Sequence, residues 1–123
     1  MSGINDLNVM DCECVVNWKY KEKIFSMPFS KIDQVMVDES RDLIFVLDKK
    51  KELPQRLSVI SGSGEVLSTF PPPDGGMFYY MTINKKKEVL VVCIFSEKID
   101  GWSDWHFSFN QKDNLLVRDS PAY

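Results

Sequence analysis

The feature that most restricts the fold of this chain is a succession of short apolar runs, rich in β-branched and aromatic residues and divided by turn-forming residues. No stretch of ten or more residues repeats its apolar positions with the 3.6-residue period of a capped helix. Short connections between the runs favour antiparallel meanders over βαβ units. The sequence therefore predicts an all-β fold whose strands cover residues 14–18, 24–27, 35–37, 43–47, 57–60, 66–70, 78–83, 89–95, 105–109 and 115–117.

The length of 123 residues predicts a single domain, and 44% hydrophobic residues are enough for one core. A weak internal repeat with an offset of 46 residues aligns residues 37–46 with residues 83–92. Residues 59–67 resemble residues 108–116 in a similar way. We therefore expect an N-terminal strand pair at 12–30, a first four-stranded unit at 31–70, a Pro/Gly loop at 71–76, a second four-stranded unit at 77–118 and a tail at 119–123.

The segment IDQVMVDESRDLIFVLDKKKELPQRLSVISGSGEVLSTF, residues 32–70, contains an apolar strand ending in Asp, a second apolar strand, and a hairpin with Gly-Glu before a hydrophobic residue. In this it resembles one blade of a β-propeller of the NHL kind, and residues 77–118 resemble such a blade more loosely. The resemblance implies two blades, a half-propeller, because closed propellers typically contain about four to eight blades. A β-sandwich or a curled antiparallel meander is the alternative.

The charge balance is mildly acidic, with 15 basic and 18 acidic residues and a net charge of −3 at pH 7. This excess argues against a protein that binds the phosphate backbone of nucleic acids. The lysine runs at 49–51 and 85–87 lie in predicted turns beside acidic residues, where lysines keep sheet edges soluble. We therefore expect no nucleic acid partner, whereas a basic protein would be attracted by the field of the chain.

The cysteines and the N-terminal residues indicate an intracellular protein. Cys12, Cys14 and Cys93 are odd in number and have no disulfide-framework spacing. The first residues have neither the basic region nor the apolar region of a signal peptide. The longest apolar run, residues 89–95, is too short to span a bilayer. These features predict a cytoplasmic protein without a membrane partner.

No group of residues matches a catalytic or metal-binding pattern. His106, the only histidine, alternates with Trp105 and Phe107 in its predicted strand, so it is expected on the surface as a residue that contacts a partner. The Cys-x-Cys pair near the N-terminus lacks the second pair of ligands that a zinc site needs. The sequence Ser-Gly-Ser-Gly at 61–64 is typical of a hairpin turn and not of a nucleophile elbow. We expect no enzyme activity, no cofactor and no metal.

The propeller resemblance implies that three predicted loops, residues 48–54, 71–77 and 96–103, lie at one end of the molecule. They bring carboxylates together with tryptophan side chains, and interfaces favour aromatic anchors surrounded by polar groups. Trp105 is expected in the core, whereas a core and an interface position are equally compatible with Trp102. The predicted partner-binding residues are Asp48, Glu52, Asp74, Glu97, Asp100, Trp102, Asp104 and His106.

Small size, acidity and the lack of catalytic motifs make the chain similar to contact-dependent growth inhibition immunity proteins of bacteria. The similarity is one of type, so no residue of that family transfers to a position here. It implies a monomer that binds one cognate cationic toxin, for example a nuclease, in a heterodimeric complex and occludes its active site. The alternative is a non-catalytic scaffold or small-ligand-binding module that completes a propeller by oligomerisation.

Overall fold

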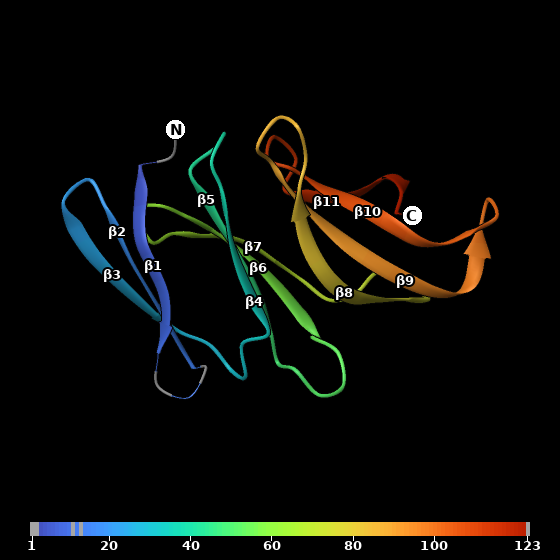
Figure 1. Ribbon diagram of the computed structural model, residues 1–123, viewed down its shortest axis with the longest axis horizontal. Helices are drawn as coiled ribbons and strands as arrows, with labels where there is room; N and C mark the ends of the chain where they lie inside the picture. The colour runs from blue at the N-terminus through green and yellow to red at the C-terminus, as the bar shows by residue number, and fades with distance from the viewer. Residues whose placement is uncertain (1–2, 11, 13, 123) are drawn as a thin grey trace.

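The computed structural model describes residues 3–10, 12 and 14–122, and the regular structure in them is entirely β. Consecutive strands pair antiparallel in a first sheet (β1-β2-β3), a second sheet (β4-β5-β6-β7) and a third sheet (β8-β9-β10-β11), with the second in the middle (Figure 1). The expected all-β fold is confirmed. The strands are β1 (Ile4–Met10), β2 (Val15–Tyr20), β3 (Lys23–Pro28), β4 (Gln34–Asp38), β5 (Leu43–Asp48), β6 (Arg56–Ser61), β7 (Val66–Phe70), β8 (Gly76–Ile83), β9 (Val89–Ile99), β10 (Trp102–Asn110) and β11 (Leu115–Pro121). No helix in these described ranges is long and apolar enough to cross a membrane.

The sequence prediction missed β1 and placed two boundaries wrongly. A β-bulge between Asn5 and Asn8, with Asp6 at a φ of 54°, breaks the alternation of β1 and hides it as a strand. β11 continues to Pro121, into the segment that was expected to be a tail. β9 and β10 occupy most of the predicted loop at 96–103, because a tight hairpin joins them.

The second sheet forms the centre of the molecule because it packs on both faces. β5 is buried along its whole length. A continuous apolar run is the pattern expected of a strand that is covered on both sides. The interface with the third sheet contains Leu43, Phe45, Leu47, Leu57, Val59, Phe78, Val91, Trp105 and Phe107, and the interface with the first sheet contains Val16, Trp18, Ile32, Ile44, Val46 and Ile60.

The second and third sheets stack with the same strand order and with corresponding ends together. β4 contacts β8 and β9, and the Asp38 carboxylate at the end of β4 accepts the N–H of Val89 at the start of β9. Equivalent residues of two sheets stacked in this way should point in the same direction. Leu43 and Val89, which the repeat offset of 46 aligns, instead both point into the shared interface. The first half of the repeat, residues 37–46 with 83–92, is therefore aligned out of register by an odd number of residues, and such a shift exchanges the two faces of a strand.

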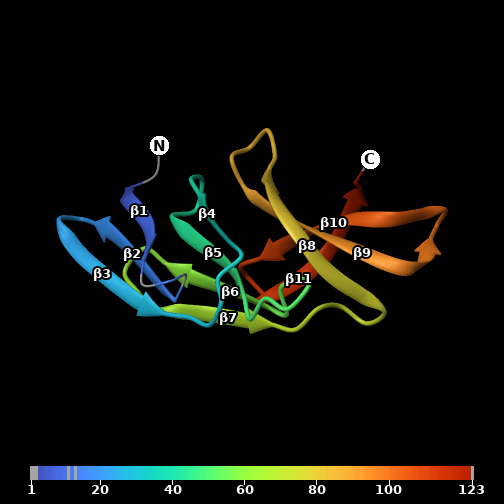
Figure 2. The same ribbon diagram turned by 60° about the horizontal axis from the view of Figure 1, so that its bottom comes forward.

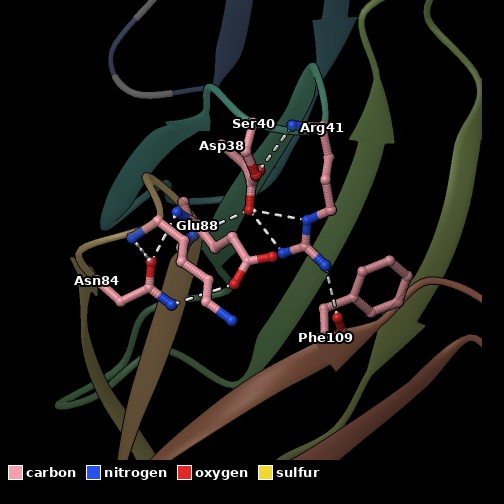
Figure 3. A network of polar contacts seen from close by, with 8 residues as sticks. Asp38, Ser40, Arg41, Asn84, Glu88 and Phe109 are labelled. Carbon is pink, nitrogen blue, oxygen red and sulfur yellow. Dashed lines mark hydrogen bonds and ion pairs between the residues drawn. The ribbon is translucent and has the colours of Figure 1, made fainter.

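A buried carboxylate links these two sheets at their common end (Figure 3). Asp38 is 0% exposed, and its Oδ2 accepts hydrogen bonds from Arg41 Nη2 at 2.6 Å and from the Val89 N–H at 2.9 Å. Arg41 also donates through Nη1 to the carbonyl oxygen of Phe109 at 2.7 Å. The Asp38–Arg41 ion pair at the β4–β5 turn thus hydrogen-bonds a backbone N–H of β9 and a backbone carbonyl oxygen of β10.

The β2–β3 turn holds two residues in the left-handed region, which is unfavourable for residues other than glycine and asparagine. Lys21 and Glu22 have φ values of 50° and 66° and lie between the paired residues Tyr20 and Lys23. A two-residue turn with both φ values positive is of type I′, which favours Asn-Gly. The double substitution Lys21→Asn, Glu22→Gly is expected to raise the free energy of unfolding by about 1–2 kcal/mol. Urea denaturation measures the gain, and an unchanged midpoint would contradict this turn geometry.

Candidate protein-binding surface

A tight hairpin joins β9 to β10 and projects at one end of the molecule (Figure 1). Ile99 pairs with Trp102, and the two residues between them, Asp100 and Gly101, have φ values of 49° and 86°. Asp-Gly is a preferred sequence for this type I′ turn, so the chain reverses here without a longer loop. The ladder is irregular between Trp102 and Asp104, which twists the hairpin arm away from the regular part of the sheet.

Trp102 and Trp105 occupy different environments on the same strand. Trp105 is 7% exposed, its indole N–H donates to the carbonyl oxygen of Trp102 at 3.1 Å, and the Arg118 guanidinium lies 4.6 Å from its ring centre. Trp102 is 42% exposed. The core position expected for Trp105 is confirmed. For Trp102 the sequence was compatible with a core or an interface position, and in the structure its side chain is exposed and not in the core.

Four of the predicted carboxylates lie near this end of the third sheet. Asp100 is at the hairpin tip, where Arg118 approaches it to 3.8 Å in an exposed ion pair. Asp104 is half-buried on β10 and accepts a hydrogen bond from the neighbouring serine hydroxyl at 3.1 Å. Glu97 on the β9 arm and Asp74 just before β8 are both exposed. Three of these four carboxylates, those of Asp74, Glu97 and Asp100, are therefore exposed at this end of the sheet.

Asp48 and Glu52 do not join this group. Asp48 is 0% exposed, and its carboxylate accepts hydrogen bonds from Arg56 Nε at 2.8 Å and from the backbone N–H of Ser30 at 3.0 Å. The hydrogen bond from Arg56 to Asp48 raises the pKa of the guanidinium. Glu52 is exposed in the β5–β6 connection, which lies apart from the β9–β10 hairpin in both views (Figures 1 and 2). The expectation that Asp48 and Glu52 join the other predicted residues is therefore corrected, because the oxygens of Asp48 are used within the fold and the connection that carries Glu52 lies apart from the hairpin.

His106 lies on the outer face of the third sheet, away from the second sheet. It pairs with Val92 and with Ser120, and its Nδ1 is 3.3 Å from the Ser120 hydroxyl oxygen. Trp105 and Phe107 on either side of it point into the core, as the predicted alternation requires. Its partner Val92 is 0% exposed, so the outer face is itself closely packed around the strand centre.

The sequence prediction missed the apolar part of this outer face. Met77, Tyr79 and Tyr80 on β8 are 42%, 46% and 37% exposed, although the segment reads as one apolar run. A bulge between Phe78 and Tyr80 turns two consecutive tyrosines toward solvent. The signal available in the sequence was the pair of adjacent tyrosines, because a regular strand buries only every second residue on one face.

Pairing across the strands connects these residues with the predicted ones. One row contains Met77, Ile94 and Asp104, and the next contains Tyr80, Val92 and His106. Aromatic and apolar side chains therefore adjoin the acidic hairpin on one face. We define the hairpin surface as Asp74, Met77, Tyr80, Glu97, Asp100, Trp102, Asp104 and His106.

The thiols and the acidic groups suggest no second site in the described ranges. Cys93 is buried in β9, and desolvation raises the pKa of its thiol to about 12, whereas Cys12 is exposed. No group of three His, Cys, Asp or Glu side chains within the described ranges is arranged to hold a metal ion. Comparison of the chain with protein-family models, with curated proteins and with solved structures finds no match.

Proposed function

We propose that the chain is a protein-binding module whose hairpin surface docks on a basic partner. More specifically, we propose an immunity protein, a cytoplasmic bacterial inhibitor that covers the active site of a cationic toxin such as a nuclease. The observation that carries the proposal is the exposed Trp102 beside the carboxylates of Asp100 and Asp104 on a type I′ hairpin.

The composition of the hairpin surface supports a role in protein recognition. Interfaces are enriched in tryptophan and tyrosine, which bury a large area at a small cost in side-chain entropy. Trp102 and Tyr80 supply such side chains, and a hairpin held by β pairing loses little further conformational entropy on binding. The surrounding carboxylates would pair with Lys and Arg in the substrate groove of a toxin and accelerate association.

Reversing two charges of the hairpin surface, Asp100→Lys with Asp104→Lys, is expected to slow association with the basic partner by about tenfold or more at low salt. The difference should shrink as salt is added, because charges are screened over about 10 Å at 0.1 M ionic strength. Stopped-flow association rates across ionic strengths measure both effects.

The double variant Glu22→Lys with Glu39→Lys is a matched control. It changes the net charge by the same amount as the hairpin variant, but at positions on the first and second sheets. If both pairs slow association equally, the total charge and not the hairpin surface steers the partner, and the proposed interface is rejected. The partner for these rates comes from capture on the immobilised chain in native extract, followed by mass spectrometry. A captured protein whose activity is not inhibited stoichiometrically would reject the immunity function.

A scaffold that assembles with copies of itself is the second candidate. The observation in its favour is the exposure of Met77, Tyr80 and Val117 on the outer face of the third sheet, at 42%, 37% and 42%. Sedimentation velocity distinguishes the two candidates. A monomer at micromolar concentration favours the inhibitor, and a defined oligomer favours the scaffold.

A further inference from the structure

The β9–β10 hairpin is joined to the rest of the third sheet by an interrupted ladder. The strands pair Asp104 with Ile94 and next pair Trp102 with Ile99. Residues 95–98 of β9 therefore lie opposite a single residue of β10, and a ladder is disrupted where one strand carries extra residues. Regular backbone pairing is thus interrupted between the body of the sheet and the tip of the hairpin.

The neighbouring strands reach the base of the hairpin, and within the described residues they do not pair with its tip. The ladder of β11 with β10 runs as far as Pro121, opposite Trp105, and β8 pairs with β9 as far as Phe95. Near the tip, Ile99 packs against the interface between the second and third sheets. The position of the tip relative to the sheet therefore depends on contacts of side chains.

Arg118 on β11 connects the hairpin tip to the core of the third sheet. Arg118 pairs with Phe107 and therefore lies on the face of the sheet that carries Trp105. Its guanidinium is 4.6 Å from the centre of the Trp105 ring, and its Nη2 is 3.8 Å from Asp100 Oδ2. The Trp105 indole N–H donates to the carbonyl oxygen of Trp102 at 3.1 Å. A chain of contacts thus runs from Asp100 through Arg118 and Trp105 to Trp102.

The two contacts of Arg118 have different strengths. The side chains of Asp100 and Arg118 are 77% and 41% exposed, so their ion pair alone contributes little. Trp105 is 7% exposed, and a guanidinium stacks on such an aromatic ring through its flat face. Because the stack orients the guanidinium beside Asp100, less conformational entropy is lost when the ion pair forms.

We propose that Arg118 is a positioning residue of the hairpin surface, which holds the tip against the sheet so that Asp100 and Trp102 face the partner in one arrangement. Its effect on binding rests on the proposed function, whereas the restraint on the hairpin exists in the free chain. A surface that is ordered before binding loses less conformational entropy in the complex. Because Arg118 is positively charged, attraction of a cationic partner does not explain its place beside Asp100.

Arg118→Ala is expected to accelerate hydrogen exchange of the Trp105 indole N–H by about fivefold or more, the change expected when a cation–π contact of ordinary strength is lost. The indole N–H of Trp18, which donates to the carbonyl oxygen of Gly62 at 2.7 Å, should exchange at its original rate. NMR of the free chain follows both signals. Lys98→Ala is the matched control, because it removes an exposed positive charge from the same hairpin and should change neither rate. Unchanged exchange at Trp105 in Arg118→Ala, or equal acceleration of both indoles, overturns the proposal.

Binding to the captured partner separates this proposal from the proposed function. Arg118→Lys keeps the net charge, but an ammonium group lacks the flat face that stacks on Trp105. We expect the partner to dissociate about fivefold faster from this variant, as measured by surface plasmon resonance. If Trp102→Ala weakens binding and Arg118→Lys dissociates at the original rate, the positioning role is overturned and the hairpin surface remains the interface. If neither variant changes the affinity, the proposed function fails, whereas faster exchange at Trp105 in Arg118→Ala still establishes the restraint on the hairpin.

Discussion

Replacing Asp38 with alanine is expected to lower the free energy of unfolding by about 3–5 kcal/mol, because removing one partner of a buried ion pair leaves the other uncompensated. The Asp38 side chain is 0% exposed and that of Arg41 is 18% exposed, so water replaces the lost contact poorly. The N–H of the buried Val89 also loses this acceptor, which adds a desolvation penalty. Urea denaturation followed by tryptophan fluorescence measures the loss, since Trp105 lies in the same interface.

The neighbouring substitution Glu39→Ala is the control, because Glu39 is exposed and its removal should change stability by no more than about 0.5 kcal/mol. Asp38→Asn keeps the shape and one acceptor oxygen but removes the charge, so an intermediate loss is expected. If Asp38→Ala costs less than about 1 kcal/mol, the ion pair does not hold the second and third sheets together.

The overall fold was predictable because burial on both faces leaves a strong signal. The run that became β5 is apolar throughout, and turn residues mark its ends. β1 was not predictable in the same way, because Asp6 in the left-handed region and the bulge remove the period-2 pattern on which strand prediction depends. The displaced register in the first half of the repeat has a related cause, since a sequence alignment records residue type and cannot detect which face a residue occupies.

The candidate site was predictable only in part. Asp100 and Trp102 lie together because the Asp-Gly turn forms from local sequence, without any long-range contact. Asp48 was indistinguishable from them in sequence, because only the fold reveals that Arg56 and Ser30 use its oxygens. The exposed tyrosines depend on a bulge in β8, and bulges arise from tertiary packing that single-sequence patterns do not contain.

Trp105→Ala is expected to lower the free energy of unfolding by about 3–5 kcal/mol, the usual cost of truncating a buried tryptophan. Trp105 packs between the second and third sheets, and its ring also carries the Arg118 guanidinium. Trp102→Ala should cost less than about 1 kcal/mol, because the side chain is 42% exposed and the hydrogen bond from Trp105 is accepted by its backbone oxygen. Urea denaturation of both variants tests the contrast.

In binding, the larger effect is expected for Trp102, whereas in stability the larger effect is expected for Trp105. If Trp102 anchors the interface, Trp102→Ala should weaken the binding free energy of the complex by at least about 2 kcal/mol, which corresponds to a rise in Kd of roughly thirtyfold. Most of that change should lie in the dissociation rate, since truncating an anchor removes contacts made only in the complex. Titration calorimetry at a temperature where both proteins remain folded measures it. A Trp102→Ala variant that unfolds easily would place this side chain in the core, and a stable variant with unchanged affinity would remove the hairpin surface from the interface.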